Sequence, residues 1–238
     1  MKSKIKYIAL FVGVIIFFIF YFNLFFDKGM MFEDSFLKQD KINGTYEYNG
    51  TAYGEDIQVT VDGEVEQSGT SNISFYIGDF FKKYYTVNAT NITDTGADIA
   101  IYEKTLLLFE GNYRKSQGTV PPIIFNRKGE PEFDIRVSVN QQSPFQASYQ
   151  VSNSQIVTTA FQDNVVIRGS IPLLLMALIL IIFTAIDMKS PLFFFQLRYM
   201  LSVNNPEPSE IYTFIQKITW YVNPVITLII LIAALLIH

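Results

Sequence analysis

Three long apolar runs constrain the fold of this 238-residue chain more than any other feature. They extend from Tyr7 to Phe26, from Gly169 to Ile186 and from Trp220 to Ile237, and none contains a charged side chain. A helix of about 20 apolar residues rises ~1.5 Å per residue and crosses a bilayer core of ~30 Å. The sequence therefore predicts a membrane protein with three transmembrane helices, over residues 1–26, 169–187 and 220–238.

The first run follows Lys2, Lys4 and Lys6, which resemble the basic start of a secretory signal. A cleaved signal peptide ends in small residues after a shorter apolar core, whereas this run ends in Phe25 and Phe26. We interpret residues 1–26 as an uncleaved signal anchor. The alternative, a cleaved signal, is the less favoured interpretation.

Basic residues predict the orientation of the three helices, because Lys and Arg near the ends of spans tend to stay cytoplasmic. The stretch 27–168 carries 19 acidic and 12 basic side chains, a net charge of −7. The basic residues elsewhere all fall on one side if the N-terminus is cytoplasmic: Lys2, Lys4, Lys6, Lys189, Arg198 and Lys217. This pattern predicts a large extracytoplasmic domain, a cytoplasmic loop over 188–219 and an external C-terminus. Trp220 and Tyr221 are expected to be anchors at the membrane interface.

The external domain, residues 40–168, has an all-β composition with turn signals between short alternating segments. Alternating segments over 57–61, 133–139 and 145–151 predict strands, and Asp62-Gly63 predicts a two-residue hairpin turn. The adjacent apolar residues of 105–110 predict a strand that is buried on both faces, and a short helix is possible over 77–85. A domain of this size suits one sandwich or open barrel of seven to nine strands. Residues 27–39 are expected to be a charged linker lying on the membrane surface.

The cytoplasmic loop divides at a Pro-rich turn that is followed by apolar residues with helical spacing. This pattern predicts an amphipathic helix over 209–219 that leads into the third span and lies in the membrane interface. The alternatives are a simple re-entry hairpin and a surface that docks a partner. The residues of that surface would be Pro206, Glu207, Pro208, Ile211, Phe214, Ile215 and Ile218.

Residues 170–238 resemble a family of small bacterial membrane proteins that have a Pro-Glu-Pro-Ser turn between two spans. The matching positions are Pro191, Glu207, Pro208, Ser209 and Tyr212. The resemblance implies a module of the bacterial inner (plasma) membrane, without known activity or catalytic residues. This chain departs from the pattern in carrying the long external β-domain, for which no resemblance is found.

Several classes of chemistry are excluded by residue counts. The chain has no cysteine, and its single histidine is His238, so it cannot build a Ser-His-Asp triad or a His- or Cys-based metal site by itself. Carboxylates remain, and Asp94 with Asp98 is a weak candidate for a Ca²⁺ site. We expect no catalytic residues and no cofactor. The tyrosines of the external domain are expected to be ordinary strand residues, with a glycan-binding platform as the alternative.

These observations favour a non-enzymatic integral membrane protein that presents a β-domain outside the cell. We expect it to act as an accessory subunit, a sensor or a binding module of a membrane complex. Its expected partners are the lipid bilayer and other membrane proteins or further copies of itself, and the acidic balance disfavours nucleic acid. Two alternatives stay open: an envelope enzyme that uses carboxylates on a glycan or lipid-linked substrate, and a component of an oligomeric channel or transporter.

Overall fold

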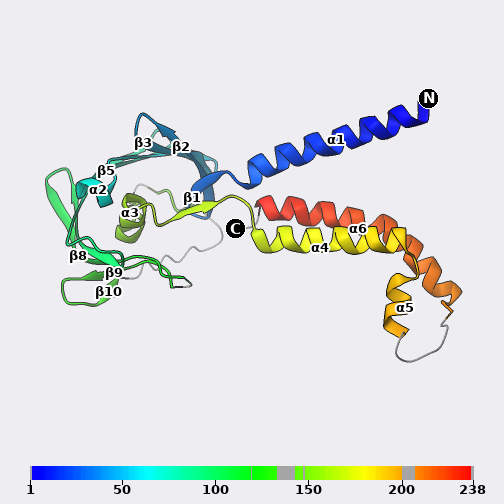
Figure 1. Ribbon diagram of the computed structural model, residues 1–238. Helices are drawn as coiled ribbons and strands as arrows, with labels where there is room; N and C mark the ends of the chain where they lie inside the picture. Colours follow the sequence, from blue (N-terminus) through cyan, green and yellow to red (C-terminus); the bar gives the residue numbers. More distant parts are fainter. Residues whose placement is uncertain (1, 119, 133–142, 147, 200–206, 237–238) are drawn as a thin grey trace. The chain divides into compact units, whose positions relative to one another are not determined.

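The computed structural model describes the chain except for residues 1, 119, 133–142, 147, 200–206 and 237–238 (Figure 1). The chain divides into two compact units. Residues 28–166 form one unit, which we call the β-unit, and residues 1–27 with 167–238 form the other, which we call the helical unit.

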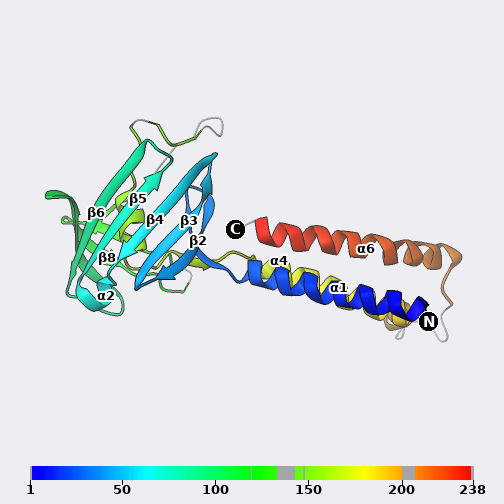
Figure 2. The ribbon, with the colours of Figure 1, turned by 90° about the horizontal axis from the view of Figure 1, so that it is seen from above.

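Over its described residues the β-unit is built on a single sheet of eleven strands, more than the predicted seven to nine. Strands β1 to β10 follow one another as an antiparallel meander, and β11 adjoins β1. The strands are β1 Lys28–Phe32, β2 Ser35–Ile42, β3 Thr45–Ala52, β4 Glu55–Asp62, β5 Thr70–Ile77, β6 Phe81–Thr90, β7 Gly96–Glu103, β8 Leu106–Arg114, β9 Ile123–Asn126, β10 Pro131–Glu132 and β11 Val165–Ile167. Because the strands form one curled sheet (Figures 1 and 2), the fold is closer to the predicted open barrel than to two packed sheets.

Short turns set the register of the first hairpins. Asn43 and Gly44 between β2 and β3 both have positive φ angles, of 52° and 90°. Tyr53 and Gly54 between β3 and β4 repeat this geometry, with φ angles of 53° and 84°. Such two-residue turns match the twist of antiparallel strands, and they fix which residues pair. The strands of these hairpins therefore turn alternate side chains to an inner and an outer face.

The inner face of the sheet carries the core of the β-unit. Helix α3, Asn153–Ala160, packs against β5 and β6 on this face and buries Ile156 and Val157 completely. Ser152 caps the helix by accepting a hydrogen bond from the backbone N–H of Gln155 at 3.1 Å. The fully buried side chains with the largest volumes in this core are Tyr48, Phe32, Phe75, Met30, Leu37, Ile73, Ile77, Ile101 and Ile124.

Several expectations for this region were wrong. Residues 27–39 are not a surface linker, because they contain β1 and the first half of β2. Residues 77–85 form the β5–β6 hairpin and not a helix. The described residues of 145–151 do not form a strand and lead into α3, and the segment 133–139 lies outside the described residues.

Two expectations for turns and burial also need correction. The connection after Asp62-Gly63 is longer than a two-residue turn, because the short helix α2, Val65–Ser68, lies between β4 and β5. The run 105–110 is not buried on both faces: Leu106, Leu107 and Leu108 are exposed by 64%, 43% and 40%. They lie where the β7–β8 hairpin turns, and only Phe109 reaches the core.

The helical unit contains α1 Lys2–Phe25, α4 Ile171–Lys189, α5 Phe193–Tyr199 and α6 Glu210–Leu236. Helices α4 and α6 are long and apolar enough to cross a membrane, as predicted from the second and third runs. Pro172 lies in the first turn of α4, where a missing N–H costs little. Helix α1 coincides with the first run, and its membrane span stays a prediction.

One continuous helix, α6, covers both the predicted amphipathic helix and the third run, and Pro224 lies in its middle. Ser209 accepts a hydrogen bond from the backbone N–H of Tyr212 at 3.2 Å, which confirms the predicted helix start after the Pro-rich turn. Ala177 and Ala234 are fully buried in the small apolar cluster of this unit, where the Tyr21 hydroxyl donates to the Leu231 carbonyl at 3.1 Å.

Candidate ligand-binding face

The outer face of the sheet is covered by amide, hydroxyl and phenol side chains arranged in rows across the strands. Strand pairing places Asn49, Gln58, Tyr76 and Lys82 side by side on β3 to β6. The same pairing builds two further rows, which are Thr60, Ser74 and Tyr84, and then Asn72, Thr86 and Tyr102. Their order follows from the period of two along each strand, which turns every second residue outward.

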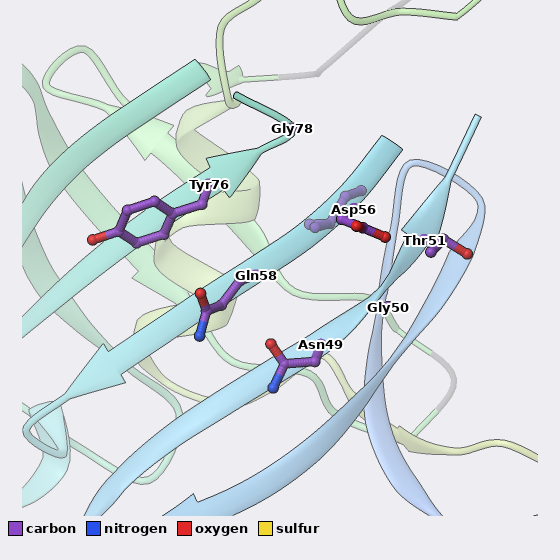
Figure 3. Close-up of a pocket in the computed structure, with 8 residues that line it drawn as sticks. Asn49, Gly50, Thr51, Asp56, Gln58, Tyr76 and Gly78 are labelled. Atoms are coloured by element: carbon purple, nitrogen blue, oxygen red, sulfur yellow. The ribbon is translucent and has the colours of Figure 1, made fainter. Parts of the chain in front are cut away.

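A shallow groove of about 670 Å³ lies over β3, β4 and β5, and we call it the first groove. Figure 3 shows Asn49, Gln58 and Tyr76 on these three strands with their side chains on the same face of the sheet. Thr51 and Asp56 line the groove toward the β3–β4 turn. Four of its lining side chains both donate and accept hydrogen bonds: Asn49, Thr51, Gln58 and Tyr76. The volume of the groove is within the range of small-molecule sites.

A second groove of about 540 Å³ lies over β6, β7 and β8. Its charged groups already have protein partners. Asp98 accepts hydrogen bonds from Asn91, at 2.6 Å, and from Asn112, and Arg127 forms an ion pair with Glu110. The remaining lining is neutral and includes Asn88, Thr90, Ala100 and Tyr102. The second groove therefore offers neutral polar groups rather than an uncompensated charge.

Three tyrosines connect the two grooves. Tyr76 lines the first groove and Tyr102 lines the second, while Tyr84 lies on β6 between the strands that carry them. The ring centroids of Tyr76 and Tyr84 are 6.1 Å apart, and their hydroxyl oxygens are 3.2 Å apart. From one strand to the next, each tyrosine is displaced by two residues along the strand direction. The three therefore form a diagonal row across β5, β6 and β7, which we call the tyrosine stripe.

Lys82 shapes the electrostatics of the tyrosine stripe. Its ammonium nitrogen lies 4.7 Å from the ring centroid of Tyr76 and 5.5 Å from that of Tyr84. Hydrogen bonding from Lys82, and then from Tyr76, lowers the pKa of the Tyr84 phenol, and the same contact with Tyr84 raises the pKa of Lys82. The Tyr84 side chain nevertheless remains 46% exposed and able to contact a ligand.

The structure does not bring the predicted metal candidates together as a site. Asp98 lies on β7 with both carboxylate oxygens bonded to asparagine amides, and Asp94 is exposed in the preceding turn. Within the part of the chain that the structure describes, no three acidic or histidine side chains gather around a common point. Asp98 thus helps to shape the second groove.

The predicted partner surface of the loop falls on α6, apart from Pro206, which lies outside the described residues, and Glu207 with Pro208, which precede the helix. The apolar residues Ile211, Phe214, Ile215 and Ile218 are all exposed, by 44% to 71%. Their exposure agrees with the predicted amphipathic stripe, while Gln216 on the other face is buried.

Of the two predicted interface anchors, Tyr221 is 79% exposed, whereas Trp220 has a specific partner. Its indole N–H donates to Asp187 at 2.7 Å, and Gln216 donates to the other oxygen of the same carboxylate at 2.7 Å. Gln216 also donates to the backbone carbonyl of Pro191. This polar cluster joins α4 to α6, and the sequence analysis missed it because the three residues are 29 and 33 positions apart.

The sequence indicated a tyrosine platform only as an alternative interpretation, and it did not place the outer-face grooves. Tyr84 and Tyr85 are neighbours, and a strand directs them to opposite faces, so that Tyr85 is buried and Tyr84 is exposed. Assigning the faces correctly requires the register, which depends on the turns.

Comparison with family models, with curated proteins and with solved structures gave no match for this chain.

Proposed function

We propose that this chain is a membrane-anchored binding module that presents the β-unit outside the plasma membrane of a bacterium. In this proposal α1, α4 and α6 span the membrane, the N-terminus is cytoplasmic, and the protein serves as an accessory subunit or sensor of a membrane complex. The bound component contacts the outer face of the sheet. The observation that carries the proposal is the tyrosine stripe, which connects two polar grooves on a domain joined to apolar helices.

Three features support this assignment of roles. The outer-face side chains contribute little to the core, because the inner face alone carries the buried cluster. Exposed tyrosine provides a rigid contact area with a polar end, which is why it is frequent in binding surfaces. The basic residues outside the stretch 27–168 fit the cytoplasmic side of a plasma membrane.

The orientation can be tested with single cysteines, because the natural chain contains none. Gln58→Cys reports on the β-unit, and Lys217→Cys reports on the loop before the third span. We expect a membrane-impermeant maleimide to label position 58 in intact cells and position 217 only after permeabilisation. Labelling of position 217 in intact cells, or of position 58 only after permeabilisation, would overturn the orientation.

Binding through the outer face can be tested with a photoactivated cross-linking residue in place of Tyr84 in the full chain. We expect an adduct in intact cells at position 84. The matched control is the same residue in place of Ile42, which is also exposed, by 50%, but lies on β2 away from both grooves. Equal adducts at positions 84 and 42, or none at position 84, would contradict the proposal.

A further inference from the structure

We propose that the outer face binds a neutral oligosaccharide, laid along the tyrosine stripe from the first groove to the second. This inference rests on the proposed function of the same face as a binding surface. It adds the chemical class of the ligand, which we derive from the side-chain chemistry, the shape and the charge of the site.

The chemistry of the face matches that of a sugar. A pyranose ring has hydroxyl groups around its edge, each of which donates and accepts hydrogen bonds, and carbon–hydrogen groups on its two faces. Asn49, Gln58 and Asn88 supply amide donors and acceptors, and the tyrosine rings supply flat apolar surfaces for stacking. An apolar ligand would remove water from the amides of Asn49 and Gln58 without replacing its hydrogen bonds, which is costly.

The shape favours an extended chain over a compact metabolite. Adjacent strands are ~4.8 Å apart, and residues two positions apart along a strand are ~6.7 Å apart, so the stripe advances diagonally by one ring per strand. Its ends lie in two separate grooves, of about 670 and 540 Å³. A ligand that contacts Tyr76, Tyr84 and Tyr102 together must therefore be long, and a chain of several sugar units has this form.

The charge of the domain favours a neutral sugar over an anionic polymer. Residues 27–168 carry a net charge of −7, which repels polyanions. Within the second groove Asp98 and Arg127 are already partnered by Asn112 and Glu110, so the ligand need not supply a charge. These observations disfavour a phosphate-rich surface polymer.

The test uses the full chain in lipid nanodiscs, because maltoside detergents are themselves sugars. Cellohexaose and chitohexaose are the neutral probes and polyglycerol phosphate is the anionic one, with binding measured by calorimetric titration. We expect at least one neutral hexasaccharide to bind with a Kd of about 1 mM or tighter. We expect Tyr84→Ala to weaken it at least about fivefold, as for the loss of one aromatic stacking contact.

Matched variants separate stacking from folding. Tyr84→Phe keeps the ring and should retain most of the affinity, while Ile42→Ala should leave it unchanged, and all three variants should unfold at the wild-type temperature. The proposal is overturned if neither neutral probe binds, if Tyr84→Ala leaves their binding unchanged, or if polyglycerol phosphate binds more tightly. If neither neutral probe binds while the cross-linker at position 84 still forms its adduct, the oligosaccharide proposal is overturned, and the proposed binding function of the outer face is retained.

Discussion

The β-unit and the helical unit place their apolar side chains in opposite ways. In the β-unit the apolar residues point inward and the amides, hydroxyls and phenols point outward. In the helical unit most apolar residues of α4 and α6 are exposed, and the buried side chains include Thr184, Gln216 and Thr227. The contrast fits the proposed membrane anchorage, in which water surrounds the sheet and lipid surrounds the two apolar helices.

In the proposed membrane setting the two units depend on different interactions. The β-unit gains stability by removing apolar surface from water. Helices in lipid gain nothing from that effect and instead rely on close packing of small residues and on polar contacts between helices. Ala177 and Ala234 provide small residues for close packing. The Trp220–Asp187–Gln216 cluster provides polar contacts between helices at the end of α4.

The largest effect is expected from truncating the core of the β-unit. Phe75 is fully buried, and its ring centroid lies 5.7 Å from that of Phe32 and 5.9 Å from that of Tyr85. Phe75→Ala should lower the free energy of unfolding by about 3–5 kcal/mol, because it removes these contacts and leaves a cavity. Denaturant unfolding of the full chain, followed by circular dichroism, measures this change.

The control for Phe75→Ala is Gln58→Ala on the outer face of the neighbouring strand. It should change the free energy of unfolding by no more than about 0.5 kcal/mol, because Gln58 is exposed. If the two variants were equally stable, the division of the sheet into a structural face and a binding face would be wrong.

The second prediction concerns the exposed apolar surface of α4. Ile179 is 52% exposed, and we expect its side chain to face lipid. Ile179→Lys should make insertion of α4 about 3 kcal/mol less favourable, because a charge near the middle of a span must be placed in hydrocarbon. The inserted fraction of α4 in a microsomal translation assay measures this. The control Ile179→Leu should insert to the same fraction as wild type. An unchanged inserted fraction for Ile179→Lys would mean that this surface of α4 contacts water or protein instead of lipid.

Elements that depend on neighbouring residues could be predicted from the sequence, whereas those that depend on distant residues could not. Helices α4 and α6 were predicted because composition over 18 or more consecutive residues is a local signal. The sheet class was predicted because Ile57, Val59 and Val61 alternate along one strand. The number of strands was not predicted correctly. In β1 and β2 many charged residues surround the few buried apolar ones, which are Met30, Phe32 and Leu37, so that no clear alternation is visible.

The start of helix α3 could have been predicted from a local sequence pattern. Ser152 followed three residues later by Gln155 is a capping pattern, and the structure shows the side chain of Ser152 accepting from the backbone of Gln155. The alternation over 145–151 was given more weight and predicted a strand. The tyrosines of the candidate site were visible in the sequence, but their alignment as a stripe depends on the pairing of β5, β6 and β7, which the turns determine.

The third prediction concerns the polar cluster of the helical unit. Asp187→Asn leaves one carbonyl oxygen for two donors, the amide of Gln216 and the indole of Trp220. A hydrogen bond to a charged group is worth about 1.5–3 kcal/mol, so the helical unit should lose about this much stability. Trp220 is the only tryptophan in the chain, so its fluorescence reports on this contact directly.

We expect the emission of Trp220 to shift to longer wavelength in Asp187→Asn, because water replaces the lost acceptor. Glu210→Gln, an exposed change in the first turn of the same helix, is the control and should leave the emission unchanged. An unaltered spectrum in Asp187→Asn would show that the cluster does not hold the indole in place.

The last prediction returns to the two faces of the sheet and concerns alkaline pH. Burial raises the pKa of Tyr48 and of Tyr85 to about 12, from an ordinary value of 10 in the unfolded chain. Between these values the unfolded state releases a proton that the folded state keeps. The contribution of these two phenols to stability is therefore fully present below pH 10, and each loses about 1.4 kcal/mol per pH unit as the pH rises toward 12.

Tyr84 on the outer face should behave in the opposite way, because Lys82 lowers its pKa and favours the phenolate. Ultraviolet absorbance at increasing pH should therefore show exposed phenols ionising first and inner-face phenols only as the β-unit unfolds. Tyr85→Phe should lessen the alkaline loss of stability, whereas Tyr84→Phe should not. Equal effects of the two substitutions would mean that neighbouring residues of β6 do not face different environments.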